Sequence, residues 1–225
     1  ESFPVDFVLK RKKNQAAPDA PAGVVFGQPI PDAASAEYER GVSRLKDNKS
    51  VPGIESLKKA IEIFPDYYNA LELLGTEYVK IGELNAAVPI LTRAVEANRN
   101  APKSLYALGV AHLKLGDTAR AIDWLRKAAE QDANNINVHM MLGLAYGTRG
   151  ALSEAEESLK KADQLSGSSL ADVHLYLAGI YNKQMKYAAA VRELELYLKK
   201  EKDLKDTSRV KEMIDKIKAK EKAGK

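Results

Sequence analysis

The stretch LELLGTEYVKIGELNAAVPILTRAVEANRN, residues 71–100, decides the fold because it contains two helix patterns separated by a break. In its first part, apolar or small residues recur at spacings of three and four, as on one face of an α-helix: Leu71, Leu74, Gly75 and Tyr78. Gly82 then stands where a helix ends in a left-handed turn, a conformation that glycine adopts at little cost. In the second part, Ala87, Leu91 and Ala94 mark the inner face of another helix. The stretch therefore predicts a helical hairpin.

The same pattern recurs about every 34 residues along the middle of the chain. One column of small residues consists of Gly41, Gly75, Gly109, Gly143 and Ala178, and a second consists of Gly53, Ala87, Ala121, Ala155 and Ala190. A column of leucines consists of Leu57, Leu91, Leu125, Leu159 and Leu194, and the turn glycines are Gly82, Gly116 and Gly150. Since a missing side chain lets two helix axes approach, we expect the leucines to fill the space beside the small residues. No hairpin buries its apolar face alone, so we expect the units to stack into a solenoid.

This period and these columns resemble the tetratricopeptide repeat. Five units fit residues 36–202, with the boundaries 36–67, 68–101, 102–135, 136–170 and 171–202. The resemblance implies an all-α fold, a right-handed superhelical solenoid of antiparallel helical hairpins. It also implies a non-enzymatic function as a scaffold for protein–protein interaction. One departure is Pro89, which lies inside a predicted helix, where a proline removes a backbone hydrogen bond.

The two ends of the chain do not follow the repeat. Residues 1–35 contain five of the nine prolines and predict an extended Pro-rich segment or linker. Apolar residues alternate near its start, at Phe3, Val5, Phe7 and Leu9. We interpret them either as the last strand of a preceding β-domain or as a disordered tail, in a chain that we expect to be a fragment of a longer protein because it begins at Glu1.

The C-terminal residues 203–225 predict a capping helix with a basic tail. The apolar stripe of this helix is Val210, Met213, Ile214 and Ile217, and its lysines are Lys216, Lys218, Lys220 and Lys222. Within the repeats, the spacing of Ser153 and Glu156 predicts a capping box, in which each side chain bonds to a backbone amide at the start of a helix.

The composition excludes several kinds of site. The 225 residues include no cysteine, which excludes disulfides, thiolate zinc sites, iron–sulfur clusters and a cysteine nucleophile. There is no phosphate-binding glycine loop, no G-x-S-x-G elbow and no H-E-x-x-H motif, so we predict that the chain is not an enzyme. We likewise expect no catalytic residue, no cofactor and no metal, because His112, His139 and His174 fit packed positions in the repeats. No apolar run approaches the roughly 20 residues that span a bilayer, so we expect no membrane insertion.

The net charge of +4 is concentrated near the C-terminus. Residues 199–225 contain eleven basic and six acidic side chains, so the repeats themselves are close to neutral. A helical-repeat protein that binds RNA needs basic and aromatic residues at equivalent sites in every unit, so we predict no nucleic-acid partner. RNA binding and self-assembly are the alternatives to the scaffold. For a soluble protein without cysteine, the interpretation of a preceding β-domain favours the bacterial envelope or periplasm over the cytoplasm.

The candidate binding site is the concave surface, which the first helix of each stacked hairpin lines. The residues one step along from the packing stripe are expected there: Tyr38, Val42, Glu72, Thr76, Lys80, Tyr106, Val110, Lys114, Met140, Leu144 and Leu175. Most are apolar or aromatic, which favours an extended or helical peptide with hydrophobic anchors. The clamp with which the family holds a peptide's C-terminal carboxylate is absent, since Val42 and Thr76 occupy its asparagine positions. The alternative is that these side chains only pack between adjacent first helices.

The partner that we predict is an unidentified protein or peptide, and the chain also carries a candidate of its own. The stretch AGVVFGQPIP, residues 22–31, is apolar and rich in proline, which lowers the entropy lost on binding. We therefore predict that the N-terminal segment covers part of the repeat surface in cis.

Overall fold

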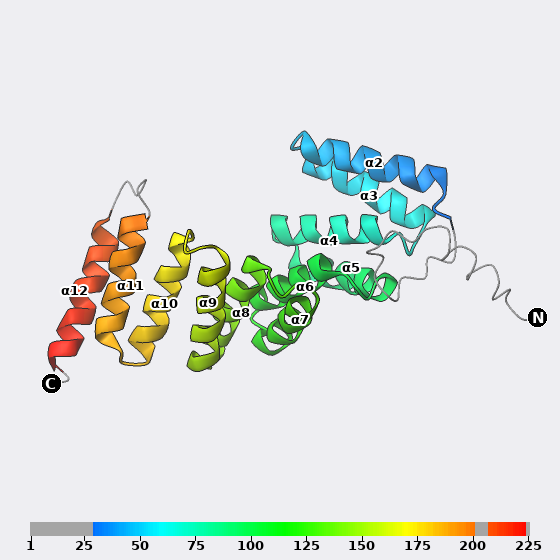
Figure 1. The fold of residues 1–225 in the computed structure, drawn as a ribbon. Coiled ribbons are helices and arrows are strands. Elements are labelled where there is room, and N and C mark those ends of the chain that lie inside the picture. The colour runs from blue at the N-terminus through cyan, green and yellow to red at the C-terminus, as the bar shows by residue number, and fades with distance from the viewer. Residues whose placement is uncertain (1–28, 201–206, 224–225) are drawn as a thin grey trace, which may run out of the picture. The chain divides into compact units, whose positions relative to one another are not determined.

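A computed structural model describes residues 29–200 and 207–223 of the chain, and within these residues it contains helices and no strand (Figure 1). The helices are α2 (Asp32–Lys46), α3 (Ser50–Ile63), α4 (Tyr68–Ile81), α5 (Leu84–Ala97), α6 (Pro102–Lys114), α7 (Thr118–Gln131), α8 (Ile136–Arg149), α9 (Leu152–Leu165), α10 (Ala171–Lys183), α11 (Tyr187–Lys200) and α12 (Ser208–Ala223). The interpretation of residues 3–9 as a strand lies outside the described residues. The predicted start of the first unit at residue 36 falls inside α2, which begins at Asp32.

The predicted helical hairpins are confirmed. Consecutive helices pack as the pairs α2–α3, α4–α5, α8–α9 and α10–α11, and α12 packs on α11. Neighbouring hairpins contact one another through α3 and α4, through α7 and α8, and through α9 and α10. The arrangement is an all-α helical repeat, and at these contacts one hairpin covers the apolar face of the next.

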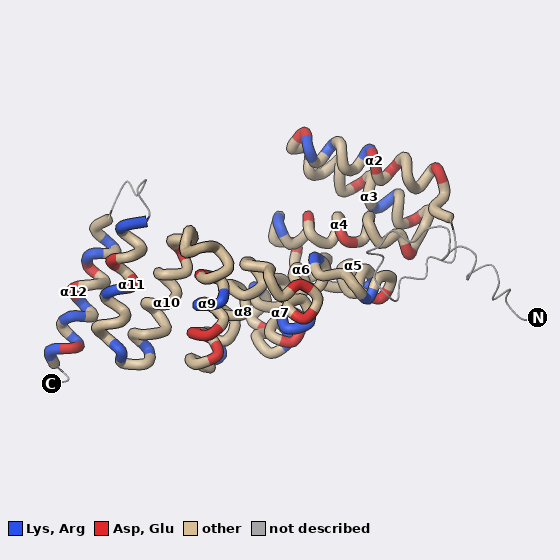
Figure 2. Tube along the Cα trace, in the orientation of Figure 1, with Lys and Arg blue, Asp and Glu red and all other residues tan. Residues whose placement is uncertain are grey.

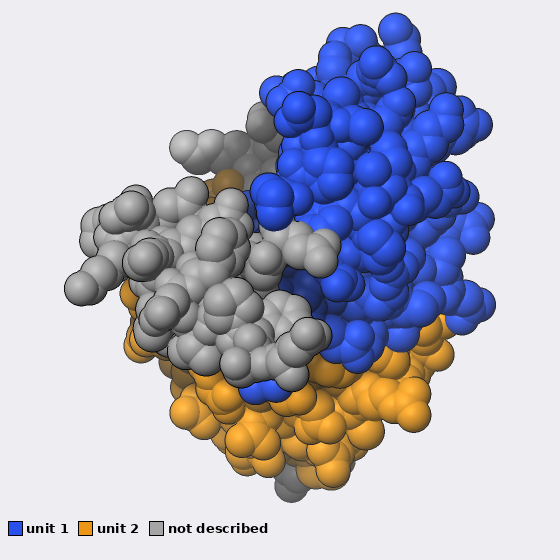
Figure 3. All heavy atoms as spheres, turned by 90° about the vertical axis from the view of Figure 1, so that its right-hand side faces the viewer, with its two compact units in different colours: residues 1–111 blue, residues 112–225 orange. Residues whose placement is uncertain are grey.

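The chain divides into two compact units, residues 1–111 and residues 112–225, with the boundary inside α6 (Figure 3). Each unit has a core of buried leucine, isoleucine, alanine and tyrosine side chains. The first core is built around Leu57, Leu71 and Leu74, and the second around Leu159, Leu177 and Leu194. A single right-handed superhelix through all five hairpins stays a prediction.

The glycine and leucine columns pack against each other as predicted. A methyl group added at Gly75 would lie 2.5 Å from Cγ of Leu91, and one added at Gly143 would lie 2.5 Å from Cγ of Leu159. Both leucines are fully buried. The missing side chain is therefore what lets the two helices of a hairpin approach closely enough for the leucine to fit.

The turns between the two helices of a hairpin share one backbone conformation. Gly82 and Gly150 have φ angles of 86°, in the left-handed region, as predicted. The equivalent positions in the first and last hairpins hold Asn48, with φ 59°, and Met185, with φ 61°. The left-handed turn is thus present also in the two hairpins that lack the glycine. Met185 adopts this left-handed conformation at a cost in free energy, because it carries a side chain.

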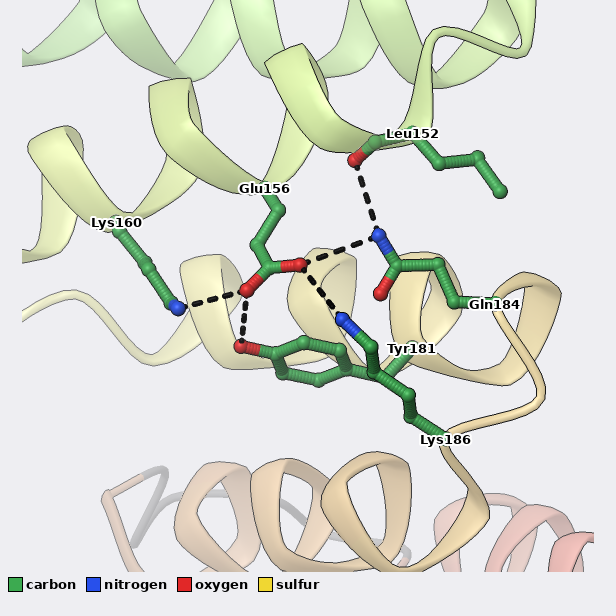
Figure 4. Close-up of polar contacts among 6 residues, drawn as sticks. All are labelled: Leu152, Glu156, Lys160, Tyr181, Gln184 and Lys186. Carbon is green, nitrogen blue, oxygen red and sulfur yellow. Dashed lines mark hydrogen bonds and ion pairs between the residues drawn. The ribbon is translucent and has the colours of Figure 1, made fainter.

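The predicted capping box at Ser153 is wrong. Helix α9 begins at Leu152, so Ser153 lies inside the first turn, and no side chain caps the helix. Glu156 instead turns toward the next hairpin (Figure 4), where its carboxylate accepts hydrogen bonds from Tyr181 Oη at 3.2 Å and Gln184 Nε2 at 3.1 Å.

The Glu156 carboxylate also contacts two ammonium groups. Lys160 Nζ lies 2.7 Å from Oε1, and Lys186 Nζ lies 3.4 Å from Oε2. These donors, first of all Lys160, lower the pKa of Glu156 to about 2. A single carboxylate therefore connects α9 to α10 and to the turn that follows it.

The C-terminal helix α12 closes the second core as predicted. Val210, Ile214 and Ile217 are buried in the same cluster as Tyr197 of α11. Met213, which was predicted to share this stripe, is 36% exposed because it lies at the edge of the buried face. The lysines of this helix are exposed, and Figure 2 shows basic residues recurring along it. No helix in the described part of the chain has the length and apolar character needed to cross a membrane.

Candidate functional site

The predicted site residues all lie on the first helices of the hairpins, at positions that repeat from hairpin to hairpin. They come from α2, α4 and α6 in residues 29–111 and from α6, α8 and α10 in the remainder. Lys80 and Lys114 are exposed, and the other nine are half-buried: Tyr38, Val42, Glu72, Thr76, Tyr106, Val110, Met140, Leu144 and Leu175. We call these eleven residues the first-helix face; one part of it lies in each unit, and we describe the two parts separately.

Glu72 is the most constrained residue of this face in the first unit. Its Oε2 atom accepts hydrogen bonds from the Tyr68 hydroxyl, one helical turn earlier, and from Ser104 Oγ of α6 at 3.0 Å. Ser104 is fully buried. The carboxylate therefore fixes α4 to α6 and is itself held in one position. Burial, followed by the bond to Glu72, raises the pKa of Tyr68.

Tyr38, a residue of α2, lies near the carboxylate of Glu72. Its ring packs on the ring of Tyr67, with the centroids 5.2 Å apart and the planes at 48°. Burial raises the pKa of Tyr38, and the nearby Tyr67 and Glu72 raise it further. Burial also raises the pKa of Tyr106 on α6. Both phenols of the face are half-buried and are therefore neutral near pH 7.

Thr76 and Lys80, on the same helix as Glu72, are occupied by local contacts. Thr76 Oγ1 donates to the carbonyl oxygens of Glu72 and Leu73, each at 2.9 Å. Lys80 Nζ lies 3.2 Å from both carboxylate oxygens of Glu77. The polar groups of these two residues are therefore engaged within α4.

Apart from the exposed Lys114, the part of the face in the second unit is apolar. Met140 and Leu144 on α8 and Leu175 on α10 are half-buried and pack against the second core. Lys183 Nζ donates to the carbonyl oxygen of Gly147 at 3.1 Å and so connects α10 to α8. Packing against the second core thus buries part of the Met140, Leu144 and Leu175 side chains, and the remaining part is exposed.

A cleft of about 310 Å³ lies elsewhere in the first unit, and the sequence did not predict it. It is lined by Lys58, Ile61, Glu62, Leu74, Tyr78, Ala86, Pro89 and Ile90, from α3, α4 and α5. The signal that could have indicated it is the pair Ala86 and Pro89, because a short side chain followed by a proline leaves little to fill the space between α3 and α5. None of the predicted site residues lines this cleft.

The three histidines have protein partners. His174 is buried, with Nδ1 2.8 Å from a carboxylate oxygen of Glu193, and His139 Nε2 lies 2.9 Å from the carbonyl oxygen of Ala133. Burial lowers the pKa of His112, although Asp117 lies nearby. Among residues 29–200 and 207–223, no three histidine, aspartate or glutamate side chains form a group that could hold a metal ion.

Comparison with known proteins finds a family of repeats that matches part of the chain. The models of the tetratricopeptide repeat family match residues 72–136 and 136–168. A comparison with curated protein sequences gives no match.

Several solved structures resemble this one. A crystal structure of MamA has 22% sequence identity and a TM-score of 0.71, covering 76% of this chain and 93% of MamA. MamA from Desulfovibrio magneticus RS-1 has 17% identity and a TM-score of 0.73, covering 79% of this chain and 100% of that one. YrrB, described as a tetratricopeptide repeat protein with an unusual peptide-binding site, has 19% identity and a TM-score of 0.67, covering 76% of this chain and 88% of YrrB. At these identities the likeness concerns the fold.

Proposed function

Because this chain is a tetratricopeptide repeat protein, we propose that it is a non-enzymatic scaffold that binds a peptide or protein segment on the first-helix face. Helical repeats of this kind present extended surfaces built from equivalent positions of successive units. The partner that this face suits is an extended or helical segment with apolar anchors, since most of its side chains are apolar or aromatic.

The observation that carries the proposal is the half-buried state of the face. Val42, Val110, Leu144 and Leu175 are neither fully buried nor fully exposed. Their buried part is fixed by packing, so a partner that covers the exposed part orders few additional side chains on binding. Tyr106 and Met140 add a rigid aromatic group and an adaptable thioether, which are common in protein-binding surfaces.

The peptide-binding site described for YrrB supports the same class of function, because YrrB has a similar fold. The repeats of this chain are close to neutral, and its excess of basic over acidic side chains lies in residues 199–225. A partner held mainly by phosphate contacts would need a basic surface along the repeats. We therefore expect the partner to be a polypeptide rather than a nucleic acid.

Selection of peptides from a random displayed library against the whole chain tests the proposal. We expect a family of related apolar sequences whose binding is weakened at least ten-fold by Tyr106→Ala or Met140→Ala. Tyr78→Ala, which removes an aromatic ring from the cleft between α3 and α5, is the matched control and should leave binding unchanged. Enrichment of no sequence, or loss of binding only in Tyr78→Ala, would contradict the proposal.

We further propose that the N-terminal stretch AGVVFGQPIP, residues 22–31, competes for this surface in cis. Its apolar residues match the chemistry of the first-helix face, and its prolines restrict the free chain, so that less entropy is lost on binding. Attachment to the same chain gives it a high effective concentration at the repeats.

A further inference from the structure

The first-helix face carries one charge in its two central columns. The first column is Tyr38, Glu72, Tyr106, Met140 and Leu175, and the second is Val42, Thr76, Val110, Leu144 and Gly179. Every other residue in them is neutral. We infer that the Glu72 carboxylate, with Tyr38 nearby, binds a cationic side chain of the partner peptide, above all arginine. This inference rests on the proposed function and specifies the chemistry of the partner.

The hydrogen bonds of Glu72 leave one of its carboxylate oxygens available. Tyr68 and Ser104 both donate to Oε2. A carboxylate has lone pairs for about four hydrogen bonds, two on each oxygen, so Oε1 retains its capacity to accept. The two donors also fix the orientation of the group, so a cation that binds Oε1 meets a carboxylate that is already in place.

The aromatic neighbours suit a guanidinium better than a neutral group. Tyr38, Glu72 and Tyr106 hold equivalent positions on α2, α4 and α6. Tyr38 is near enough to Glu72 for the carboxylate to help raise the pKa of the phenol, so a guanidinium bonded to Glu72 lies close to the Tyr38 ring. Arginine stacks on aromatic rings and is attracted by their faces. The ring of Tyr38 is held against Tyr67, which is only 5% exposed, so its position is fixed as well.

No basic side chain of the same helix neutralises this carboxylate. Lys80 is the one basic residue within α4, and its ammonium lies against Glu77, 3.2 Å from each carboxylate oxygen. Glu72 is half-buried, so its charge is less screened by water than that of a fully exposed residue. Glu72 therefore favours a peptide that supplies the missing positive charge.

The test uses N-acetylarginine amide and its uncharged isostere N-acetylcitrulline amide, titrated into the whole chain while backbone amide shifts are followed by NMR. We expect a saturable shift at Tyr38, Ser104 and Tyr106 with the arginine compound, and at least ten-fold weaker binding with the citrulline compound. Glu72→Gln, which keeps an oxygen that can accept from Tyr68 and Ser104, should abolish the preference for arginine. Glu83→Gln removes one negative charge from the exposed turn of the same hairpin. This control variant should keep the preference for arginine.

Equal binding of the two compounds to the unaltered chain would overturn the inference, whatever the stability of the variants. A preference for arginine that persists in the Glu72→Gln variant would also overturn the inference. The proposed function fails separately, if the library selects no peptide. Selected peptides that depend on Tyr106 but contain no basic residue would leave the scaffold standing and overturn only the recognition of a cation.

Discussion

Gly143 and Leu159 show at the scale of single residues how this fold is encoded. The leucine fills the space that the glycine leaves, and a methyl group at Gly143 would lie 2.5 Å from Cγ of Leu159. Around the place where a Cβ of Gly179, in α10 of the same unit, would be, no atom lies within 4 Å apart from its chain neighbours and the nearby backbone of its own helix. The two glycines therefore differ in their surroundings: Gly143 leaves room for a packed leucine, and Gly179 does not. The sequence alone does not distinguish them.

Replacement of these two glycines by alanine should have opposite effects. Gly143→Ala is expected to lower the free energy of unfolding by about 1–3 kcal/mol, because the methyl group overpacks a fully buried site. Gly179→Ala is expected to raise it by up to about 1 kcal/mol, because alanine has the higher helix propensity and nothing obstructs it. Urea denaturation of both variants measures the difference. Equal effects of the two would contradict the role assigned to the glycine column.

Glu156 predicts a dependence of stability on pH. Its pKa is lowered from 4.5 to about 2 in the folded protein, so the folded state holds the charged form more strongly than the unfolded chain does. Its contribution is therefore complete above about pH 4.5 and is lost as the pH falls toward 2. Glu156→Gln should be less stable than the unaltered protein at pH 7, and the difference should disappear near pH 2. Acid denaturation curves of the two proteins measure this difference in stability. If it stays constant between pH 7 and pH 2, the charge of Glu156 does not stabilise the fold.

The residue scale also shows what the sequence could and could not indicate. The partners Gly143 and Leu159 belong to columns with a regular spacing, so their contact could be predicted. Tyr181 and Lys186 lie 25 and 30 residues from Glu156, and no spacing rule relates them to it. Ser153 and Glu156 instead had the spacing of a capping box, and that local rule was misleading because α9 begins at Leu152.

At the scale of the element, the turns between paired helices depend on one left-handed residue. Three central hairpins use glycine there, whereas Asn48 and Met185 occupy the position in the outer two. Glycine at three equivalent positions could be read from the sequence as a turn signal. The same turn at Met185 could be inferred only from its place in the repeat, since methionine itself favours helix.

Met185→Gly should therefore stabilise the last hairpin. The left-handed conformation costs an L-residue about 1–2 kcal/mol, and glycine removes this cost while losing about 0.4–1 kcal/mol through the greater freedom of the unfolded chain. The side chain of Met185 is 75% exposed, so little packing is lost. Met185→Ala is the control and should bring no gain, because it leaves the backbone conformation unfavourable. Thermal denaturation that ranks the alanine variant with or above the glycine variant would contradict this explanation.

The candidate site stays a prediction at this scale. The helical period assigns its eleven residues to the first helices of the hairpins, where the structure has them, and their role in binding is part of the proposed function. For the cleft between α3 and α5 the sequence offered only the pair Ala86 and Pro89 as a signal, because the volume of the cleft depends on residues of three different helices.

At the scale of the whole molecule, the N-terminal segment and the repeats are proposed to interact. Deletion of residues 1–30 should raise the affinity for added peptides, because a competitor is removed, and should lower the melting temperature, because its contacts are lost. Fluorescence titration and calorimetry of the shortened and full chains measure the two effects. If both quantities stay unchanged, the segment does not bind the repeats.

The central claim is that the first-helix face binds the partner, and methyl NMR of the whole chain with a library-selected peptide tests it most directly. The account predicts that the peptide shifts the methyl signals of Val42, Val110, Leu144 and Leu175, and leaves those of Ile61 and Ile90 in the cleft unchanged. Shifts confined to Ile61 and Ile90, with the four signals of the first-helix face unmoved, would contradict it.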